Sequence, residues 1–235
     1  MAEKSCLITT SLIGSIEWYK TAPDTPTKAD PSITWAQKAR VDLENTLNRV
    51  YETNEAAERG NEFEKKLYSV AKKIKPKTKW GVFDEDYDLS DQPGSKEFKQ
   101  MLAEVAGGIY QKNGKMKTEI AGEQCLLFGR YDVWYEDRVK DVKTTGNYKK
   151  GKYLNTFQHI LYLYLTGYKK FEYNVAEWDE YPKIKRVYKE TFEIGKDMSE
   201  KELKINVEQT VAEALDFLKN TDNYWELYKN NFCLY

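Results

Sequence analysis

The chain of 235 residues predicts an α/β fold in which a mixed β-sheet is flanked by helices. The order of its patterns gives the first reason, because helical spacing is followed by three strand-like runs, a helix, two strand-like runs and further helices. The composition gives the second, because 40% hydrophobic residues, with 6 Trp, 18 Tyr and 9 Phe, supply a core. No internal repeat is present. We therefore expect one domain over 1–235, with a helical part over 1–110, a sheet core over 115–195 and terminal helices over 199–235.

The N-terminal third has the spacing of amphipathic helices. Apolar residues at three- and four-residue steps predict a first helix, which follows a proline-rich loop. We expect Gly60 to end this pattern, and a second helix to begin at Phe63. A third, short helix is expected over 95–106, with Ser95 as its N-cap. The stripe of the first helix is Trp35, Ala39, Leu43, Leu47 and Val50.

The middle of the chain changes to short runs of β-branched and aromatic residues. Three such runs in succession predict neighbouring antiparallel strands. A run that is apolar on most sides then predicts a buried helix, and the C-terminal part ends in an amphipathic helix and an aromatic tail. The expected strands cover 116–121, 124–135, 139–144, 171–178 and 186–194, and the buried helix covers 154–165.

The net charge of −1 conceals strong local charge. Residues 65–79 hold seven lysines and no acid, whereas 84–91 are acidic. Residues 138–170 hold eight basic side chains against the single acid Asp141. A charge run is usually a solvated helix face, but the second basic stretch, with its one acid, also suits the binding of nucleic-acid phosphates.

Several classes of protein are excluded or disfavoured. Cys6, Cys125 and Cys233 lack the spacing of a zinc or iron–sulfur site, and we expect them to be reduced thiols in a cytoplasm. With His159 as the single histidine, a catalytic triad or a histidine metal cage is nearly excluded. No apolar run is long enough to cross a membrane, and the start of the chain does not have the pattern of a secretory signal. The chemistry must therefore come from carboxylates and lysines.

The candidate site lies on two of the expected strands. Asp132 is on one strand, and Asp141 and Lys143 are on the next. Residues two apart on a strand point to the same face, and a hairpin could bring Asp132 beside them. Two converging carboxylates repel each other unless a cation joins them, and oxygen ligands of this kind suit Mg²⁺ or Mn²⁺. An acid two residues before a lysine occurs four times in the chain, but only this pair lies in an expected strand.

The motifs together resemble the PD-(D/E)XK nuclease superfamily, especially its RecB-like and lambda-exonuclease-like branches. Arg59 to Glu64 resembles the R-G-x-x-x-E helix motif, and Asp132 matches the strand aspartate. Asp141-Val142-Lys143 matches (D/E)-x-K, and Gln158 with Tyr162 resembles the Q-x-x-x-Y helix motif. The segment 11–15 is similar to the N-terminal segment of RecB-like members. The resemblance spans roughly residues 9–178.

This resemblance implies a restriction-endonuclease-like fold and a role for each matching residue. Asp132 and Asp141 would be metal ligands, together with the Val142 carbonyl and Glu64, for which Glu62 is the alternative. Lys143 would position the attacking water. The residues expected to shape the site or bind substrate are Gln158, Tyr162, Arg59, Lys149 and Lys150.

The implied function is that of a Mg²⁺-dependent DNA exonuclease, with Mn²⁺ as a substitute, in phage or bacterial recombination or repair. Its expected partners are DNA, further copies of the chain, and a single-strand-annealing or recombination protein, with no membrane and a cytoplasmic location. The sequence leaves the polarity of digestion, strand preference and the choice between DNA and RNA open.

Other interpretations remain at this point. Asp132 and Lys143 could form a salt bridge that only organises the sheet, and Gln158 could serve a polar need inside a packed helix. The domain could be a catalytically inactive nuclease fold that binds nucleic acid or a protein. It could also be a structural or inhibitory protein that docks through its aromatic C-terminus.

Overall fold

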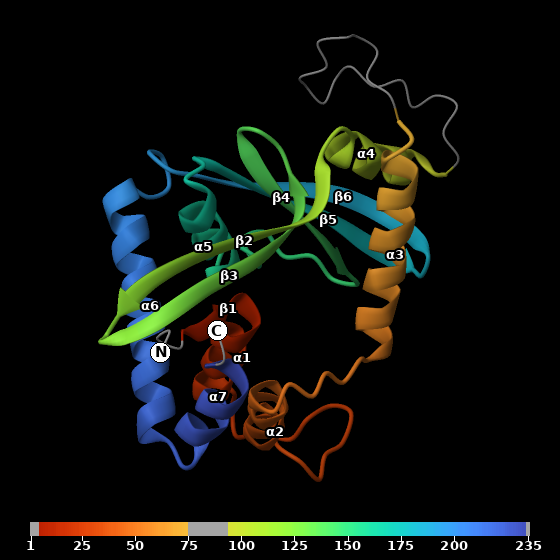
Figure 1. Cartoon of the computed structure of the whole chain (residues 1–235). Helices are drawn as coiled ribbons and strands as arrows, with labels where there is room; N and C mark the ends of the chain where they lie inside the picture. The colour runs from red at the N-terminus through yellow and green to blue at the C-terminus, as the bar shows by residue number, and fades with distance from the viewer. Residues whose placement is uncertain (1–4, 75–93, 234–235) are drawn as a thin grey trace.

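The computed structural model describes residues 5–74 and 94–233. In these residues a six-stranded mixed sheet carries helices on both faces, as Figure 1 shows. The expected mixed sheet flanked by helices is therefore confirmed. The acidic run 84–91 and residues 75–79 of the lysine-rich stretch lie outside the described residues.

The strands and helices follow the order predicted from the sequence, with two elements added at the start. The strands are β1 (Cys6–Thr9), β2 (Ile109–Ile120), β3 (Glu123–Trp134), β4 (Arg138–Thr145), β5 (Lys170–Glu180) and β6 (Lys183–Glu193). The helices are α1 (Thr10–Thr21), α2 (Trp35–Leu47), α3 (Glu55–Ala71), α4 (Lys96–Val105), α5 (Phe157–Thr166), α6 (Glu200–Asn220) and α7 (Tyr224–Phe232).

Strand β3 has three neighbours in the sheet, and two of them share one of its edges. Its other edge pairs with β2 in antiparallel register along nearly the whole strand. On the shared edge, β1 is parallel to residues 125–128, and β4 is antiparallel to Val133 and Trp134. Residues 129–132 therefore lie at a break between β1 and β4. Beyond β4 the sheet continues with β5, which is parallel to β4, and β6, which is antiparallel to β5.

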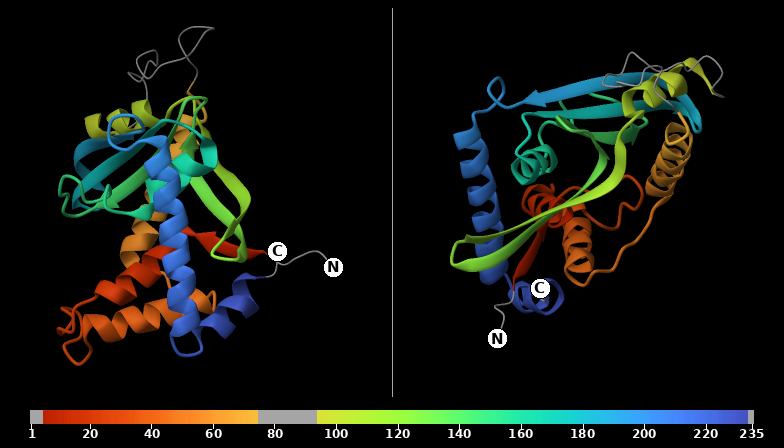
Figure 2. Two further views of the ribbon diagram at one scale, coloured as in Figure 1. Left: turned by 90° about the vertical axis from the view of Figure 1, so that its left-hand side faces the viewer. Right: turned by 45° about the horizontal axis from the view of Figure 1, so that its top comes forward.

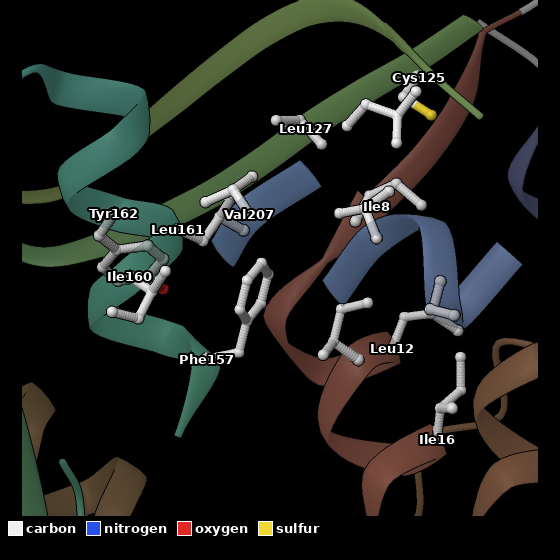
Figure 3. Close-up of a cluster of buried hydrophobic side chains, with 14 of the residues drawn as sticks. Ile8, Leu12, Ile16, Cys125, Leu127, Phe157, Ile160, Leu161, Tyr162 and Val207 are labelled. Carbon is white, nitrogen blue, oxygen red and sulfur yellow. The ribbon is translucent and has the colours of Figure 1, made fainter. Parts of the chain in front are cut away.

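The larger hydrophobic core lies on the face of the sheet that α1, α5 and α6 cover. Figure 3 shows Leu12 and Ile16 of α1, Phe157 and Leu161 of α5, and Val207 of α6 among its side chains. They pack over β1 and β3, whose Ile8 and Leu127 are completely buried. This packing fixes the start of α1 and the start of α5 on either side of the break in the sheet.

The second core lies on the opposite face, under α3 and α4 (Figure 2). Helix α4 presents Met101, Leu102 and Val105, all fully buried, and the Ser95 side chain accepts a hydrogen bond from the Phe98 backbone as its N-cap. The expected short helix is therefore confirmed. Helix α3 adds Phe63 and Leu67, so it is held against β4 and β5 at one side of the site.

Two expectations about the N-terminal part are wrong. Gly60 does not end a helix but lies inside α3, where a Cβ atom would come within 3.1 Å of the Thr144 hydroxyl oxygen on β4. The absence of a side chain at Gly60 therefore allows α3 to lie close to β4, and the glycine does not interrupt the helix. Val50 is not part of the apolar stripe of α2, because α2 ends at Leu47 and Val50 is 49% exposed.

The expectation of three reduced thiols is also wrong in this structure. Cys6 and Cys233 form a disulfide that joins β1 to the end of α7, while Cys125 is a free, buried thiol. Periodicity and spacing gave no sign of this pair, because 227 residues separate its members. Within residues 5–74 and 94–233, every helix is too short or too polar to cross a lipid bilayer.

Candidate active site

Asp132 occupies the break in the sheet, at the point where β3 and β4 separate. The registered pairs of these strands are only Val133–Lys140 and Trp134–Val139, so the next position brings Asp132 opposite Asp141. One carboxylate oxygen of Asp132, Oδ2, accepts a hydrogen bond from the Val142 backbone N–H at 2.9 Å. The side chain thus takes the place of the strand hydrogen bond that β3 no longer makes. The Val142 carbonyl as a metal ligand stays a prediction.

The other oxygen of Asp132 is held by a residue that the sequence did not point to. Gln111 of β2 lies between the registered pairs Tyr110–Val133 and Lys112–Tyr131, and its Nε2 donates to Asp132 Oδ1 at 3.2 Å. Gln111 has a φ of 58°, in the left-handed region that glutamine rarely adopts. Such backbone conformations persist where the surroundings hold them, and they cluster at functional sites.

Asp141 and Lys143 lie two residues apart on β4 and form a direct ion pair. Lys143 Nζ is 2.7 Å from Asp141 Oδ2, and Gln158 Nε2 of α5 donates to Asp141 Oδ1 at 2.6 Å. Asp141 is 2% exposed, whereas the Lys143 side chain is 29% exposed. Both oxygens of the buried carboxylate are therefore held, and the lysine that pairs with it is partly exposed.

Tyr162 connects α5 to the same break. Its hydroxyl donates to the Arg130 carbonyl at 2.8 Å, which satisfies a backbone group at the break between β1 and β4. This contact requires Gly129, because a Cβ there would lie 2.7 Å from the Tyr162 ring. Tyr162 is only 4% exposed. In the structure Gln158 and Tyr162 are thus positioning residues for Asp141 and β3, and their contact with nucleic acid stays a prediction.

Helix α3 contributes Glu64 to the cluster. Glu64 is half-buried beside Asp141, Lys143 and Arg130, whose charges all act on it. Glu62 is exposed, and it accepts a hydrogen bond from the Tyr181 hydroxyl at 2.7 Å. Of the two glutamates that the sequence offered, Glu64 is therefore the one whose charge acts on the aspartates.

The electrostatics of the cluster show an excess of negative charge. Burial, and then repulsion by Asp141, raise the pKa of Glu64 to about 7. Burial, and then repulsion by Asp141 and Glu64, raise the pKa of Asp132 well above its usual value. Burial alone would lower the pKa of Lys143, but the charge of Asp141 and its hydrogen bond raise it instead. One firmly protonated ammonium group therefore faces three carboxylates.

This donor set suits a divalent cation, although the side chains are not closed around one. In the described ranges, no three His, Cys, Asp or Glu side chains form a group arranged to hold a metal ion as they stand. The mutual repulsion of Glu64, Asp132 and Asp141 is nevertheless the condition that a dication relieves, and carboxylate oxygens are the ligands that Mg²⁺ and Mn²⁺ prefer.

The remaining predicted residues lie outside the carboxylate cluster. Arg59 of α3 pairs with Glu55, and its guanidinium lies 5.5 Å from the centre of the Tyr181 ring. Lys149 and Lys150 are exposed in the loop between β4 and α5. Neither lysine is brought into contact with the carboxylates, so their role as substrate contacts remains a prediction.

Arg130 is a further residue that sequence reasoning missed. It lies on β3 two residues before Asp132 and lines a cavity of about 450 Å³ with Glu64, Lys65 and Lys72. Gln111 lines the same cavity. A strand-borne arginine close to the strand aspartate was the available signal, since residues two apart on a strand share a face.

Comparisons with known proteins concern only the arrangement of the elements. No family model matches the chain, and no curated protein is similar to it. Among solved structures, SSO0001 is 12% identical with a TM-score of 0.49, covering 98% of this chain and 87% of its own. The alkaline exonuclease LHK-Exo from Laribacter hongkongensis is 15% identical with a TM-score of 0.47, covering 95% and 92%.

A third similar structure is Rai1 from Scheffersomyces stipitis, which is 18% identical with a TM-score of 0.35 and covers 93% of this chain and 62% of its own. The similar structures thus include an exonuclease. At these identities the likeness is one of fold alone and does not extend to chemistry.

Proposed function

We propose that the chain is a metal-dependent nuclease that hydrolyses phosphodiester bonds of DNA and acts from strand ends. The observation that carries this proposal is the meeting of Glu64, Asp132 and Asp141, from α3, β3 and β4, around the single ammonium group of Lys143. The sequence motifs that resemble the PD-(D/E)XK nucleases support the choice of substrate and of exonuclease action.

Asp132 and Asp141 would hold Mg²⁺ or Mn²⁺, with Glu64 as a further ligand from the helix side. The bound ion would supply Lewis-acid activation of the phosphodiester. Gln158 and the Val142 N–H fix the two aspartates before substrate arrives, so their oxygens need little reorganisation.

Lys143 would orient the attacking water and stabilise charge that develops on the phosphoryl group. Its pKa is raised by the Asp141 contact, so it keeps its proton at neutral pH and acts as a donor. The Lys143 side chain is 29% exposed and lines an open cavity, from which a phosphate could reach it. Arg130, Lys65 and Lys72 would bind neighbouring phosphates of the same strand.

The test is a titration with Mg²⁺, and separately with Mn²⁺, of the wild type, Lys143→Ala and Asp132→Asn on end-labelled linear DNA and on covalently closed circles. We expect the wild type to digest linear DNA only with the metal, and both variants to lose at least about 100-fold in rate. Lys201→Ala is the matched control, because Lys201 is an exposed lysine of α6 that does not line the cavity beside Glu64. Cleavage of circles would contradict action from ends, and cleavage undiminished by Lys143→Ala would contradict the site.

A second candidate is a catalytically inactive domain of this fold that binds nucleic acid. The observation that favours it is the lack of a closed metal-ligand group in the described ranges. It predicts that DNA binds equally well with EDTA and with Mg²⁺ and that wild-type protein leaves the DNA intact. The same titration, read by a gel-shift assay beside the digestion assay, separates the two.

A further inference from the structure

A second cavity, with a lining different from that of the arginine and lysine groove, adjoins the carboxylate cluster at Lys143. It measures about 670 Å³ and lies between α1 and the start of α5. Lys143 and Gln158, the two side chains that hold Asp141, form one end of it. The cavity is open to solvent, and its volume has room for a small organic group such as a nucleobase.

The walls of this cavity are aromatic. Trp18 of α1, Tyr153 of the loop before α5 and Phe157 of α5 line it. The Trp18 ring is supported by an edge contact with Trp35 at 6.0 Å, and the Tyr153 ring packs against Tyr173 at 5.6 Å. Rings held in place by packing offer a flat face at little cost in conformational entropy.

The lining of this cavity carries less positive charge than the lining of the groove beside Glu64. Among the described residues that line the cavity, Lys143 is the only cation and Glu17 the only acid. The groove beside Glu64 contains Arg130, Lys65 and Lys72 instead. A phosphate chain suits the cationic groove, whereas an uncharged planar ring suits the aromatic cavity.

We propose that the cavity between α1 and α5 binds the base of the terminal nucleotide, by stacking on Trp18. The inference rests on the proposed function, because it places the base next to the phosphate that Lys143 contacts. Serine and threonine residues also line the cavity and would give polar contacts without preference for one base; they are Thr10, Ser11, Thr21 and Thr156.

Gly14 allows the cavity to be filled without disturbing its walls. It lies on the lining within α1, and a Cβ atom built on it meets no atom within 4 Å. Gly14→Leu should therefore block the cavity while the helix gains a residue of higher helical propensity. Gly14→Ala adds only a methyl group and serves as the size control.

The experiment measures binding of deoxyadenosine monophosphate and of deoxyribose 5-phosphate by equilibrium dialysis in EDTA. We expect the wild type to bind the nucleotide at least about tenfold more tightly than the sugar phosphate. Trp18→Ala and Gly14→Leu should each weaken nucleotide binding about tenfold or more, since stacking on an aromatic ring contributes this much per base. Trp18→Phe and Gly14→Ala should keep it within about threefold, and thermal unfolding checks that each variant is folded.

Equal binding of nucleotide and sugar phosphate, or unchanged nucleotide binding in both Trp18→Ala and Gly14→Leu, would overturn the subsite. Because the assay contains no metal, it is independent of hydrolysis. Digestion of DNA by a protein that fails the dialysis test would reject the base subsite alone. Nucleotide binding that depends on Trp18, in a protein that does not digest DNA, would reject the proposed activity alone.

Discussion

The orientation of Asp132 depends on a glutamine in an unusual conformation. Gln111 donates to one carboxylate oxygen and the Val142 N–H donates to the other, so the aspartate has hydrogen bonds from both sides. The left-handed φ of Gln111 costs about 1–3 kcal/mol of backbone strain for a residue with a Cβ. A residue that bears strain and holds a site carboxylate is expected to trade stability for function.

Gln111→Gly tests this trade directly. Glycine relieves the strain, and its own entropic cost is only about 0.5–1 kcal/mol, so the free energy of unfolding should be unchanged or higher. Activity should fall about 10- to 100-fold with a higher Mg²⁺ requirement, because the aspartate loses its second hydrogen bond. Urea unfolding and a Mg²⁺ titration of DNA digestion measure the two effects. A variant that is both more stable and fully active would show that Gln111 does not position Asp132.

His159 gives the fold a dependence on acid pH. The ring is 1% exposed, its Nδ1 lies 3.2 Å from the Tyr173 hydroxyl, and burial lowers its pKa to about 4. In the unfolded chain the histidine has its ordinary pKa of about 6.5. Between about pH 4 and pH 6.5 the unfolded chain therefore binds a proton at this residue, whereas the folded chain does not. The contribution of the neutral ring to the free energy of unfolding is therefore fully present above about pH 6.5, and it decreases as the pH falls toward 4.

We expect this histidine to remove about 2 kcal/mol from the free energy of unfolding between pH 7 and pH 5. Urea unfolding at both values measures the total change, and His159→Gln reports the part that belongs to the ring. The glutamine variant should be less stable at pH 7 but should lose about 2 kcal/mol less on acidification. An identical loss in wild type and variant would assign the acid sensitivity to other groups, such as the carboxylates of the site.

At the scale of elements, the loop between β4 and α5 is fixed by two glutamates of the sheet. Glu190 of β6 accepts hydrogen bonds from the Tyr148 hydroxyl at 2.7 Å and from the Gly151 N–H at 2.6 Å. Glu177 of β5 accepts from the Tyr148 N–H at 3.2 Å. The loop carries Lys149 and Lys150 and leads to Tyr153, so these contacts set the rim of the proposed subsite.

Glu190→Ala should release this loop, whereas Glu190→Gln should keep it in place, because the amide oxygen can accept the same two hydrogen bonds. Trypsin under native conditions should cut the alanine variant after Lys149, Lys150 or Lys152 at least about tenfold faster than the wild type. DNA binding should weaken in the same variant if the loop lysines contact phosphate. Equal rates of cutting in the alanine and glutamine variants would mean that Glu190 does not hold the loop.

The elements that sequence patterns predicted best are those with a single strong periodicity. Helix α4 and strands β3 to β6 lie close to their expected positions because each has a run of apolar or aromatic residues that packs into the two cores. Strand β1 and helix α1 were not predicted, since four strand residues and a helix with few periodic positions give little local signal. Gly60 was read as a break because local propensity cannot show that Thr144 lies against it.

In the site, too, local sequence patterns could place only the residues that are neighbours along a strand or across a hairpin. Asp141 and Lys143 could be placed on one face because the two-residue strand period is local. Asp132 could be placed near them through a hairpin. Gln111 could not be assigned a role, because its contact with Asp132 depends on the left-handed conformation of β2 at that position. Tertiary contacts of this kind leave no periodic trace in a sequence.

For the whole molecule, β1 and the end of α7 are joined at the edge of the described chain. The disulfide between Cys6 and Cys233 links the first strand to the last helix (Figure 1). Strand β1, which contains Cys6, pairs with β3 and leads directly into α1. The Tyr228 hydroxyl of α7 also donates to the Leu7 carbonyl at 3.2 Å, so the last helix braces the strand that borders the site.

The disulfide closes a loop of nearly the entire chain, and this predicts a large contribution to stability. Cross-linking residues 227 positions apart removes conformational entropy from the unfolded chain worth about 5 kcal/mol in the chain-entropy description. Reduction should therefore lower the midpoint of thermal unfolding by about 10–20 °C for a chain of this size. Differential scanning calorimetry of the oxidised and reduced protein measures the shift, and thiol titration under denaturing conditions confirms one free thiol before reduction and three after it.

Cys233→Ser separates the cross-link from other effects of the reductant. The variant should melt at the temperature of the reduced wild type, and reductant should not change it further. Digestion of DNA at a temperature where both forms are folded should differ little, because the carboxylates are held by β3, β4 and α5 rather than by α7. If the reduced and oxidised proteins unfold at the same temperature, the two cysteines are not joined in solution. In that case the packing of Tyr228 and Phe232 holds α7 against β1 without the disulfide.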